Sequence, residues 1–311
     1  MSEMRNLVIG CDGTWNETQM PPDTNVAKLL RALSASGQVQ HYEEGVGTAH
    51  MEALPGGIYG QGLDRQILGA YRFLSNRFSD SEWPAERNRI FIFGFSRGAY
   101  AARRLAGLVS RCGVPTEADD VELAWRLYLN RDNDSMGDLK ERGFLVDVPV
   151  AVLGVWDTVK TTTDEDFDDH KLPDCVEHGY HAMAIDERRR FFRVLRWNKD
   201  DRVRQVWFAG VHSDIGGGYE ETGLSDIALK WMIDCAYGHG LKFKASAVER
   251  FDPDPCGPLH DSYTGIWKPF GARRRSIAKS ALVHSSVRER CEQAPDYRPA
   301  NLPAEANYVD E

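Results

Sequence analysis

One short segment limits the fold of this chain more than any other: residues 94–98, Gly-Phe-Ser-Arg-Gly, which follow the apolar run RIFIF at 89–93. The run predicts a buried strand, and the residues after the second glycine have the spacing of a helix that ends near Gly113. A serine on a sharp turn from strand to helix needs small neighbours two positions away on either side, and glycine stands at both. The turn exposes the Ser96 hydroxyl above the sheet edge, at a helix N-terminus that favours negative charge. We therefore predict that Ser96 is a nucleophile.

Strand-like and helix-like segments alternate along the chain, which is typical of βαβ units and a mostly parallel sheet with helices on both faces. A length of 311 residues suits one such core. We expect a single α/β domain over residues 1–311, with its core at about 5–290 and an irregular, proline-rich tail at 291–311. Strands are predicted at 6–11, 39–42, 89–93, 148–156 and 204–211, and helices at 26–33 (N-cap Thr24), 63–78, 100–109, 121–129 and 225–232 (N-cap Ser225).

The composition is that of an ordinary globular protein. With 42% hydrophobic and 27% charged residues, the chain is neither disordered, collagen-like nor a coiled coil. It carries 38 Lys and Arg against 47 Asp and Glu, so the net charge of −9 disfavours nucleic acid as a partner. The basic run at residues 273–275 is short, and we expect a solvated loop or the start of a helix there.

The cellular location follows from segments that the sequence lacks. No stretch reaches the roughly 18 apolar residues that cross a bilayer, and the first residues do not have the pattern of a secretory signal. The six cysteines are scattered without a CxxC pair, which favours reduced, mostly buried thiols over a zinc site. We expect a cytoplasmic protein without a transmembrane segment; export by a route that needs no signal peptide stays open, and so does the oligomeric state.

A nucleophilic serine needs a base and a carboxylate that orients the base, and on this kind of scaffold they follow as Asp or Glu and then His. Asp157 comes directly after the strand predicted at 148–156, at the sheet edge where the serine lies, although the position would also suit a helix N-cap. His212 ends the strand at 204–211 and opens the glycine-rich segment HSDIGGGY. We predict Asp157 and His212 as the partners of Ser96. The alternatives are His284 as the base and Asp214 as the carboxylate.

Attack on an ester carbonyl creates an oxyanion, which two backbone N–H groups should stabilise. Arg97, directly after the nucleophile, should supply one of them, and Gly13 or Thr14 in the loop after the first strand should supply the other. Asp12 would hold that loop by accepting local N–H bonds. The same loop superficially suggests the phosphatase motif D-x-D-G-T, but Gly10 stands where that chemistry needs its nucleophilic Asp, so we reject this interpretation.

Six segments, in order, carry a resemblance to a known family: CDGTWN (11–16), TNVAKL (24–29), YEEGVGT (42–48), GFSRGAYAAR (94–103), GVWDTV (154–159) and VWFAGVHSDIGGGY (206–219). Over roughly residues 6–290 the chain resembles an uncharacterised α/β-hydrolase domain family that includes phospholipase effectors of type VI secretion systems. The resemblance implies an α/β-hydrolase fold and a triad of Ser96, Asp157 and His212. It also implies esterase or phospholipase A chemistry on acyl esters.

Our leading hypothesis is a serine hydrolase that cleaves carboxylic (acyl) esters of a small molecule or a lipid through an acyl-enzyme, without metal or cofactor. Acyl transfer to another alcohol would use the same residues. One alternative is a non-catalytic binding or scaffold protein with the same fold. The other is a metal-dependent hydrolase, because carboxylate and imidazole groups suit several divalent ions. Its ligands would be Asp12, Asp157, His212 and Asp214.

Overall fold

A computed structural model describes residues 4–13, 23–45, 59–80, 82–160 and 170–310. Its main sheet contains β1 (Arg5–Cys11), β2 (Gln38–Glu43), β3 (Asn88–Phe95), β6 (Val150–Trp156), β7 (Val176–Ala184), β8 (Val203–Phe208), β9 (Leu282–His284) and β10 (Asn307–Val309). The strand order is β10-β9-β8-β7-β6-β3-β1-β2, and every described pairing between neighbours is parallel. A short antiparallel pair, β4 (Val114–Pro115) with β5 (Leu145–Val146), lies apart from it.

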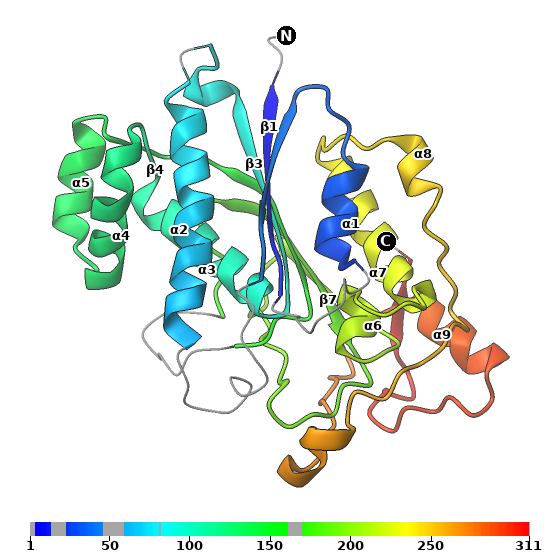
Figure 1. Cartoon of the computed structure of the whole chain (residues 1–311). Helices are drawn as coiled ribbons and strands as arrows, with labels where there is room; N and C mark the ends of the chain where they lie inside the picture. Colours follow the sequence, from blue (N-terminus) through cyan, green and yellow to red (C-terminus); the bar gives the residue numbers. More distant parts are fainter. Residues whose placement is uncertain (1–3, 14–22, 46–58, 81, 161–169, 311) are drawn as a thin grey trace.

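Helices cover both faces of the main sheet, which confirms the predicted α/β-hydrolase-like fold (Figure 1). One face packs against α2 (Tyr59–Phe78) and α3 (Ser96–Cys112), with α4 (Val121–Asn130) and α5 (Asn133–Glu141) outside them. The other face packs against α1 (Asn25–Ala32) and α7 (Gly223–Gly238). The remaining helices are α6 (His212–Gly216), α8 (Ala245–Val248), α9 (Ser285–Gln293) and the 3₁₀ turns η1 (Ala85–Arg87), η2 (Ala118–Asp120) and η3 (Gly265–Phe270). No helix in the described ranges is long and apolar enough to cross a bilayer.

The two hydrophobic cores follow from the alternation of side chains along each strand. In β1, Leu7 and Ile9 pack with the α2 and α3 side, whereas Val8 packs with the α1 and α7 side. All three side chains are fully buried, as expected for a parallel strand that is covered on both faces. Both cores therefore hold the sheet rigidly beneath its carboxyl edge.

The sequence predicted some elements wrongly. It missed β7, whose first half mixes Glu177 and His178 with apolar residues. It placed the N-cap of α7 at Ser225, whereas the helix begins at Gly223 after Thr222. The tail after residue 291, expected to be irregular, contributes β10 to the edge of the sheet.

Candidate active site

Ser96 lies on a strained turn between β3 and α3. Its φ of +58° is in the left-handed region, which side chains other than glycine rarely adopt. A Cβ at Gly94 would come within 2.5 Å of the Gly98 carbonyl oxygen, and one at Gly98 would come within 2.2 Å of the Cys11 carbonyl oxygen. Both positions therefore require glycine, as the sequence predicted, because α3 starts directly against the end of β1.

The structure brings together the three side chains that the sequence singled out. Ser96 follows β3, Asp157 follows β6, and His212 begins α6 after β8. His212 Nε2 lies 2.8 Å from Ser96 Oγ, and His212 Nδ1 lies 2.6 Å from Asp157 Oδ2. Asp157 and His212 are fully buried, and Ser96 is 7% exposed. The three residues form a continuous chain of polar contacts at the carboxyl edge of the sheet.

Arg275 anchors the carboxylate of Asp157 from a distant part of the chain. Its guanidinium donates to both carboxylate oxygens, at 2.5 and 2.8 Å. It also donates to the carbonyl oxygens of Ala184 and Phe192, each at 2.8 Å. The expectation of a solvated basic run at residues 273–275 is therefore wrong for its last member, whose side chain is only 5% exposed. A planar guanidinium can hold a carboxylate in this two-bonded geometry, which fixes the plane of the Asp157 carboxylate.

The protonation states of the pair follow from burial and nearby charge. Burial alone would raise the pKa of Asp157, but the Arg275 charge and the contact with His212 outweigh it and hold that pKa well below its ordinary value. Burial lowers the pKa of His212, against the opposing pull of Asp157. Near neutral pH, the site therefore combines an ionised carboxylate with a neutral imidazole.

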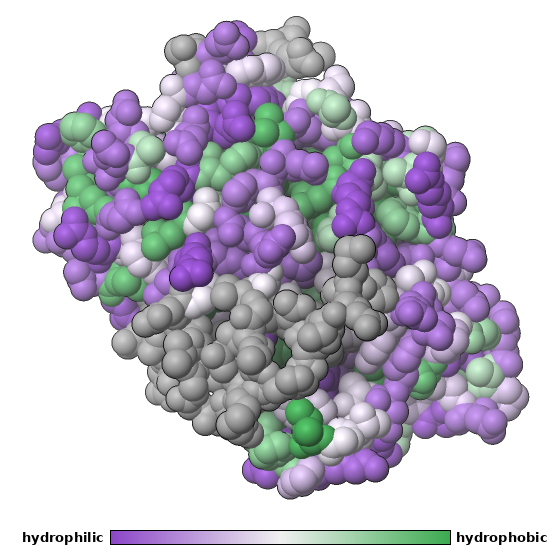
Figure 2. Space-filling view, in the orientation of Figure 1, coloured by the Kyte–Doolittle hydropathy of each residue, from purple (hydrophilic) through white to green (hydrophobic). Residues whose placement is uncertain are grey.

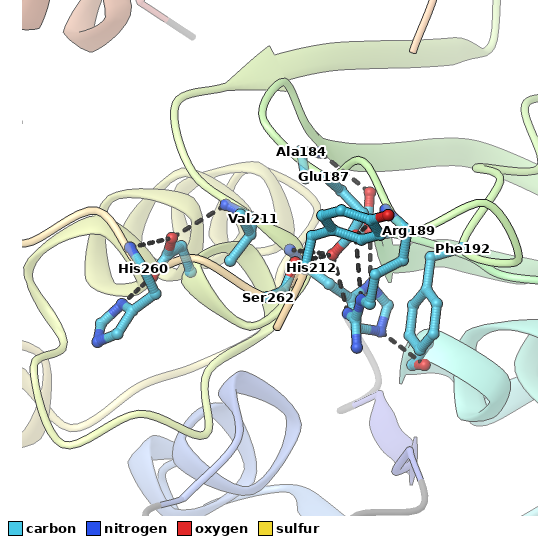
Figure 3. A network of polar contacts seen from close by, with 12 residues as sticks. Ala184, Glu187, Arg189, Phe192, Val211, His212, His260 and Ser262 are labelled. Carbon is cyan, nitrogen blue, oxygen red and sulfur yellow. Dashed lines mark hydrogen bonds and ion pairs between the residues drawn. The ribbon is translucent and has the colours of Figure 1, made fainter. Parts of the chain in front are cut away.

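A second buried ion pair lies next to His212 and supports it (Figure 3). Glu187 and Arg189 pair through two contacts, at 2.8 and 3.0 Å, and Glu187 Oε2 accepts the backbone N–H of His212 at 3.3 Å. Ser262 Oγ donates to the same oxygen at 2.9 Å. The ring of Phe192 stands edge-on to the imidazole, with 5.1 Å between centroids. The orientation of His212 is thus fixed by its backbone, its ring and its Nδ1 atom.

The alternative carboxylate, Asp214, holds a different histidine. Asp214 Oδ1 lies 2.6 Å from His260 Nδ1, and its other oxygen accepts the Val211 N–H at 2.9 Å (Figure 3). This carboxylate closes the first turn of α6, the element on which His212 stands. Asp214 therefore acts on the local backbone, and it is Asp157 that contacts the His212 ring.

The alternative base, His284, lies at the end of β9, which is separated from β3 by β6, β7 and β8 in the sheet. Its Nδ1 lies 2.8 Å from Ser286 Oγ, and its ring stacks on Phe208 with 4.8 Å between centroids. Burial lowers its pKa to about 4. The structure does not bring His284 to Ser96.

The loop after β1 approaches the serine closely, because a Cβ on Gly13 would come within 3.0 Å of Ser96 Cβ. The Gly13 N–H donates to Asp12 Oδ1 at 2.8 Å, so in this conformation it points to the carboxylate. The other Asp12 oxygen accepts from the hydroxyls of Tyr42, at 2.7 Å, and Thr24. Asp12 thus holds the loop, as expected from the sequence. Two further oxyanion donors were predicted. Arg97 directly follows Ser96 in α3, and Thr14 lies outside the described residues.

The four residues of the metal hypothesis do not form one ligand set. Asp157 is held by Arg275 and His212, Asp214 is held by His260, and Asp12 faces Thr24 and Tyr42. In the part of the chain that the structure describes, no group of three or more His, Cys, Asp or Glu side chains is arranged to hold a metal ion. A cation at Asp157 would compete with a guanidinium that already occupies both carboxylate oxygens.

Sequence reasoning missed the residues that support Asp157 and His212. Glu187 and Arg189 lie in the segment DERRRFF after β7, and Arg275 lies in the run at 273–275. The one available signal was the cluster of charged residues next to the two phenylalanines in DERRRFF, because charged side chains near buried segments are usually paired. No motif spacing identifies which arginine turns inward.

Comparison with known proteins agrees with this architecture. The family model described as "T6SS, Phospholipase effector Tle1-like, catalytic domain" matches residues 5–235. A Saccharomyces cerevisiae protein, "Uncharacterized protein YEL023C", is 29% identical; the match covers 62% of this chain and 33% of that protein, so the chain spans about one third of this relative. An uncharacterized protein from Pseudomonas aeruginosa has a similar structure (TM-score 0.53, 18% identity, 81% of this chain and 49% of that one). The Tle1 effector bound to the VgrG spike of the type 6 secretion system gives a TM-score of 0.47 at 20% identity, over 72% of this chain and 53% of that one.

Proposed function

The chain belongs to the family of Tle1-like catalytic domains of type VI secretion phospholipase effectors, and from that premise we propose that it is a serine hydrolase of carboxylic (acyl) esters. Membership of this family supports hydrolysis of esters, as in a phospholipase, without specifying the catalytic residues. The observation that carries the finer assignment is the contact chain from Ser96 Oγ through His212 to Asp157, with distances of 2.8 and 2.6 Å. Such a chain on a strand-to-helix turn is the geometry of an activated serine.

In the proposed mechanism, the neutral His212 accepts the Ser96 proton at Nε2 as Ser96 Oγ attacks the acyl carbonyl. Asp157 accepts the Nδ1–H of His212 and stabilises the imidazolium that forms. His212 then donates the proton to the leaving alkoxide, which leaves as the alcohol, and a water molecule activated by His212 releases the acid from the acyl-enzyme. The backbone N–H of Arg97, together with that of Thr14 in the loop after β1, would stabilise the oxyanion in each half of the reaction. The Gly13 N–H could take the second role only by leaving Asp12 Oδ1.

We assign Arg275 as a positioning residue in this mechanism. It touches no reacting atom, but it fixes the plane of the carboxylate that orients His212 and keeps this carboxylate ionised. An Asp157 that took up a proton would lose part of its hold on the imidazolium. The catalytic carboxylate is therefore maintained by a side chain from outside the family match at residues 5–235.

The proposed substrate is a lipid acyl ester, because the matching family model is described as that of a phospholipase effector. Cleavage of the phospholipase A kind, at a carboxylic ester, is the form that attack by Ser96 on an acyl carbonyl would give. Two aromatic rings contact His212, those of Phe95 and Phe192, with centroid distances of 4.7 and 5.1 Å. The Phe95 ring is fully buried in the core, whereas the Phe192 ring is only partly buried. The partly exposed Phe192 ring would suit an acyl chain better than a charged leaving group. Transfer of the acyl group to an alcohol other than water would use the same residues.

The test is labelling with a fluorophosphonate probe and turnover of short p-nitrophenyl esters and phospholipid vesicles. The wild type should be labelled and active, and Ser96→Ala should be neither. Ser75→Ala is the matched control, because Ser75 is also a buried helical serine and its hydroxyl has no partner in the described structure. Equal labelling of wild type and Ser96→Ala would overturn the assignment. The absence of any Ser96-dependent turnover across these esters would instead favour the non-catalytic scaffold.

A further inference from the structure

Two segments that are distant in the sequence meet beside the candidate active site, and we call them together the basic–aromatic surface: residues 188–193 and 265–279. The Arg273 N–H donates to the Arg188 carbonyl oxygen at 2.7 Å, and Arg189 forms a β-bridge with Ala272. Backbone contacts therefore hold the two segments side by side. The surface lies beyond the carboxyl edge of the sheet, where η3 projects from the body of the molecule (Figure 1, orange).

The charge of this surface is opposite to that of the whole protein. Its 21 residues contain nine Arg and Lys and no Asp or Glu, although the chain has a net charge of −9. Arg189 and Arg275 point inward to Glu187 and Asp157. Arg188 pairs with Asp261, and its side chain remains 42% exposed. The other six cations are exposed: Arg190, Arg193, Lys268, Arg273, Arg274 and Lys279.

Apolar side chains stand among these cations. Ile266 in η3 is 66% exposed, and Phe191 is 39% exposed. The rings of Phe191 and Phe270 meet edge to face, with 5.4 Å between centroids. Figure 2 shows hydrophobic atoms among hydrophilic ones at the lower end of the molecule, where Figure 1 draws η3. A single exposed apolar residue is ordinary, but here several of them gather on one basic surface.

The aromatic part of the surface continues to the reacting groups. Trp267 in η3 contacts Phe192 edge to face at 5.2 Å, and Phe192 contacts the His212 ring at 5.1 Å. Arg189 lies over the face of Phe192, at 3.4 Å from its centroid. A ligand held on this surface would therefore be next to the residues that contact Ser96.

We propose that the basic–aromatic surface docks the protein on an anionic phospholipid bilayer and so presents membrane lipids to Ser96. The inference rests on the proposed ester-hydrolase function and specifies how its substrate is presented. The exposed cations would bind the phosphates of an anionic leaflet. The aromatic side chains and the exposed Ile266 suit the boundary between lipid headgroups and acyl chains. A nucleic acid would pair with the cations, but its phosphate backbone would offer no apolar contact to the exposed Ile266.

The experiment measures co-sedimentation of Ser96→Ala protein with vesicles, so that binding is separated from turnover. Vesicles that mix phosphatidylcholine with phosphatidylglycerol should bind the protein, and salt should weaken this binding. Arg273→Glu/Arg274→Glu should lower the affinity for these vesicles by about tenfold or more, because each surface cation contributes to the attraction. Ile266→Glu should lower binding at both low and high salt, since it removes an apolar contact.

Matched controls lie outside the basic–aromatic surface. Tyr237 is 68% exposed near the end of α7, close to Gly240, which contacts Asn6 at the amino end of β1. Tyr237→Glu should bind vesicles like the parent protein. Arg87, before β3, and Arg126, in α4, serve for charge: Arg87→Glu/Arg126→Glu makes the same change in net charge away from the surface.

Three results would overturn the proposal: no binding to the mixed vesicles, equal loss of binding in surface and control variants, or displacement of the vesicles by a single-stranded oligonucleotide that binds the same surface more tightly. Failure of the proposed function looks different. In that case the vesicles are bound, yet no soluble or vesicle ester is cleaved in a Ser96-dependent way. If only the docking fails, the wild type still cleaves soluble short-chain esters.

Discussion

The candidate site is assembled from two unlike regions of the chain. The family-matched region, residues 5–235, contributes the three side chains of the proposed triad. Ser96 and Asp157 directly follow β3 and β6, and His212 begins α6, shortly after β8. The region from 257 to 281 contributes no reacting group and consists mainly of irregular chain. It nevertheless reaches into the site three times, through His260, Ser262 and Arg275.

The difference between the two regions is one of physical task. A reacting side chain must meet its partners in one geometry, and strand ends within a rigid sheet provide that geometry. A supporting side chain needs only to reach a buried carboxylate with a charge or a hydrogen bond, and a loop can carry it. Removing one partner of a buried ion pair is nevertheless costly, because the remaining charge stays buried without a partner. Substitutions in the two regions should therefore fail in different ways.

The largest effect is expected from the base itself. His212→Ala should lower kcat by about 10³-fold or more, because Ser96 would lose its proton acceptor. The measurement is turnover of a short p-nitrophenyl ester, with thermal unfolding as a check that the fold is kept.

His284→Ala is the matched control for that substitution. This histidine is also partly buried at a strand end, but it contacts Ser286 and Phe208 instead of Ser96. Its loss should leave kcat unchanged within about twofold. A large loss of kcat in His284→Ala together with a small one in His212→Ala would reverse the two assignments.

Arg275→Met should give the next largest effect and should show it in two ways. The free energy of unfolding should fall by about 3 kcal/mol, because Asp157 would stay buried without its cation. At temperatures where the variant is folded, kcat should fall by about 10²-fold, since the carboxylate and with it the imidazole would lose their fixed orientation.

The pH profile separates positioning from mere stability. Arg275 holds the pKa of Asp157 below its ordinary value, so this carboxylate is ionised throughout the usual pH range. Without Arg275, burial raises that pKa, and the acid limb of kcat/KM should move to higher pH. Arg274→Met, the exposed neighbour, should leave turnover of the soluble ester and its pH profile unchanged. An Arg275→Met protein with a normal acid limb would show that Arg275 has only a structural role.

The sequence made the fold and the meeting of Ser96, Asp157 and His212 predictable for the same reason. β1, β3, β6 and β8 read as apolar runs with a polar residue at or after their ends, so a parallel sheet and its functional edge follow together. Against this, β7 was missed because Glu and His interrupt its apolar pattern. Its central place between β6 and β8 follows from pairing, which composition alone does not indicate.

The supporting residues were beyond sequence reasoning for a different physical reason. Residues 273–275 are three consecutive arginines, of which two are exposed and one is buried on Asp157. Chemically they are the same, and only the path of the irregular chain around Ala272 decides which one turns inward. The same holds for the arginines at 188–190, of which only Arg189 pairs with Glu187. The pairing of a buried charge is a property of the folded chain rather than of local sequence.

Within the family-matched region, the charge of Arg189 should set the pH at which His212 becomes neutral. Burial lowers the pKa of His212, and the Arg189 charge lowers it further, while Asp157 and Glu187 oppose this. Arg189→Met removes a cation and leaves the Glu187 carboxylate without its partner, so imidazolium becomes more favourable. The pKa of His212 should rise, and since the base must be neutral, the acid limb of kcat/KM should move to higher pH.

The compensating variant is Arg189→Met/Glu187→Gln, which removes both opposing charges. Its acid limb should return toward that of the wild type, measured with the same soluble ester. If Arg189→Met and the double variant have the same pH profile, the charge of Glu187 does not affect the pKa of His212. Its contact with the His212 backbone would then be only structural.

The smallest effect should come from His260, the member of the 257–281 region that lies two contacts away from the reacting groups. His260→Gln removes the ring from Asp214, but this carboxylate keeps the Val211 N–H and so still closes the first turn of α6. We expect the free energy of unfolding to fall by about 1 kcal/mol, the usual contribution of one hydrogen bond. Turnover should change by no more than about twofold, because the contacts of His212 with Ser96 and Asp157 remain. Asp214→Asn is the sharper partner variant, since its amide has one acceptor oxygen where the carboxylate has two, and it cannot accept from both the Val211 N–H and an N–H at His260 Nδ1. If His260→Gln lowered turnover as strongly as Arg275→Met, support from this region would not depend on direct contact with the catalytic carboxylate, and the division of tasks between the two regions would be wrong.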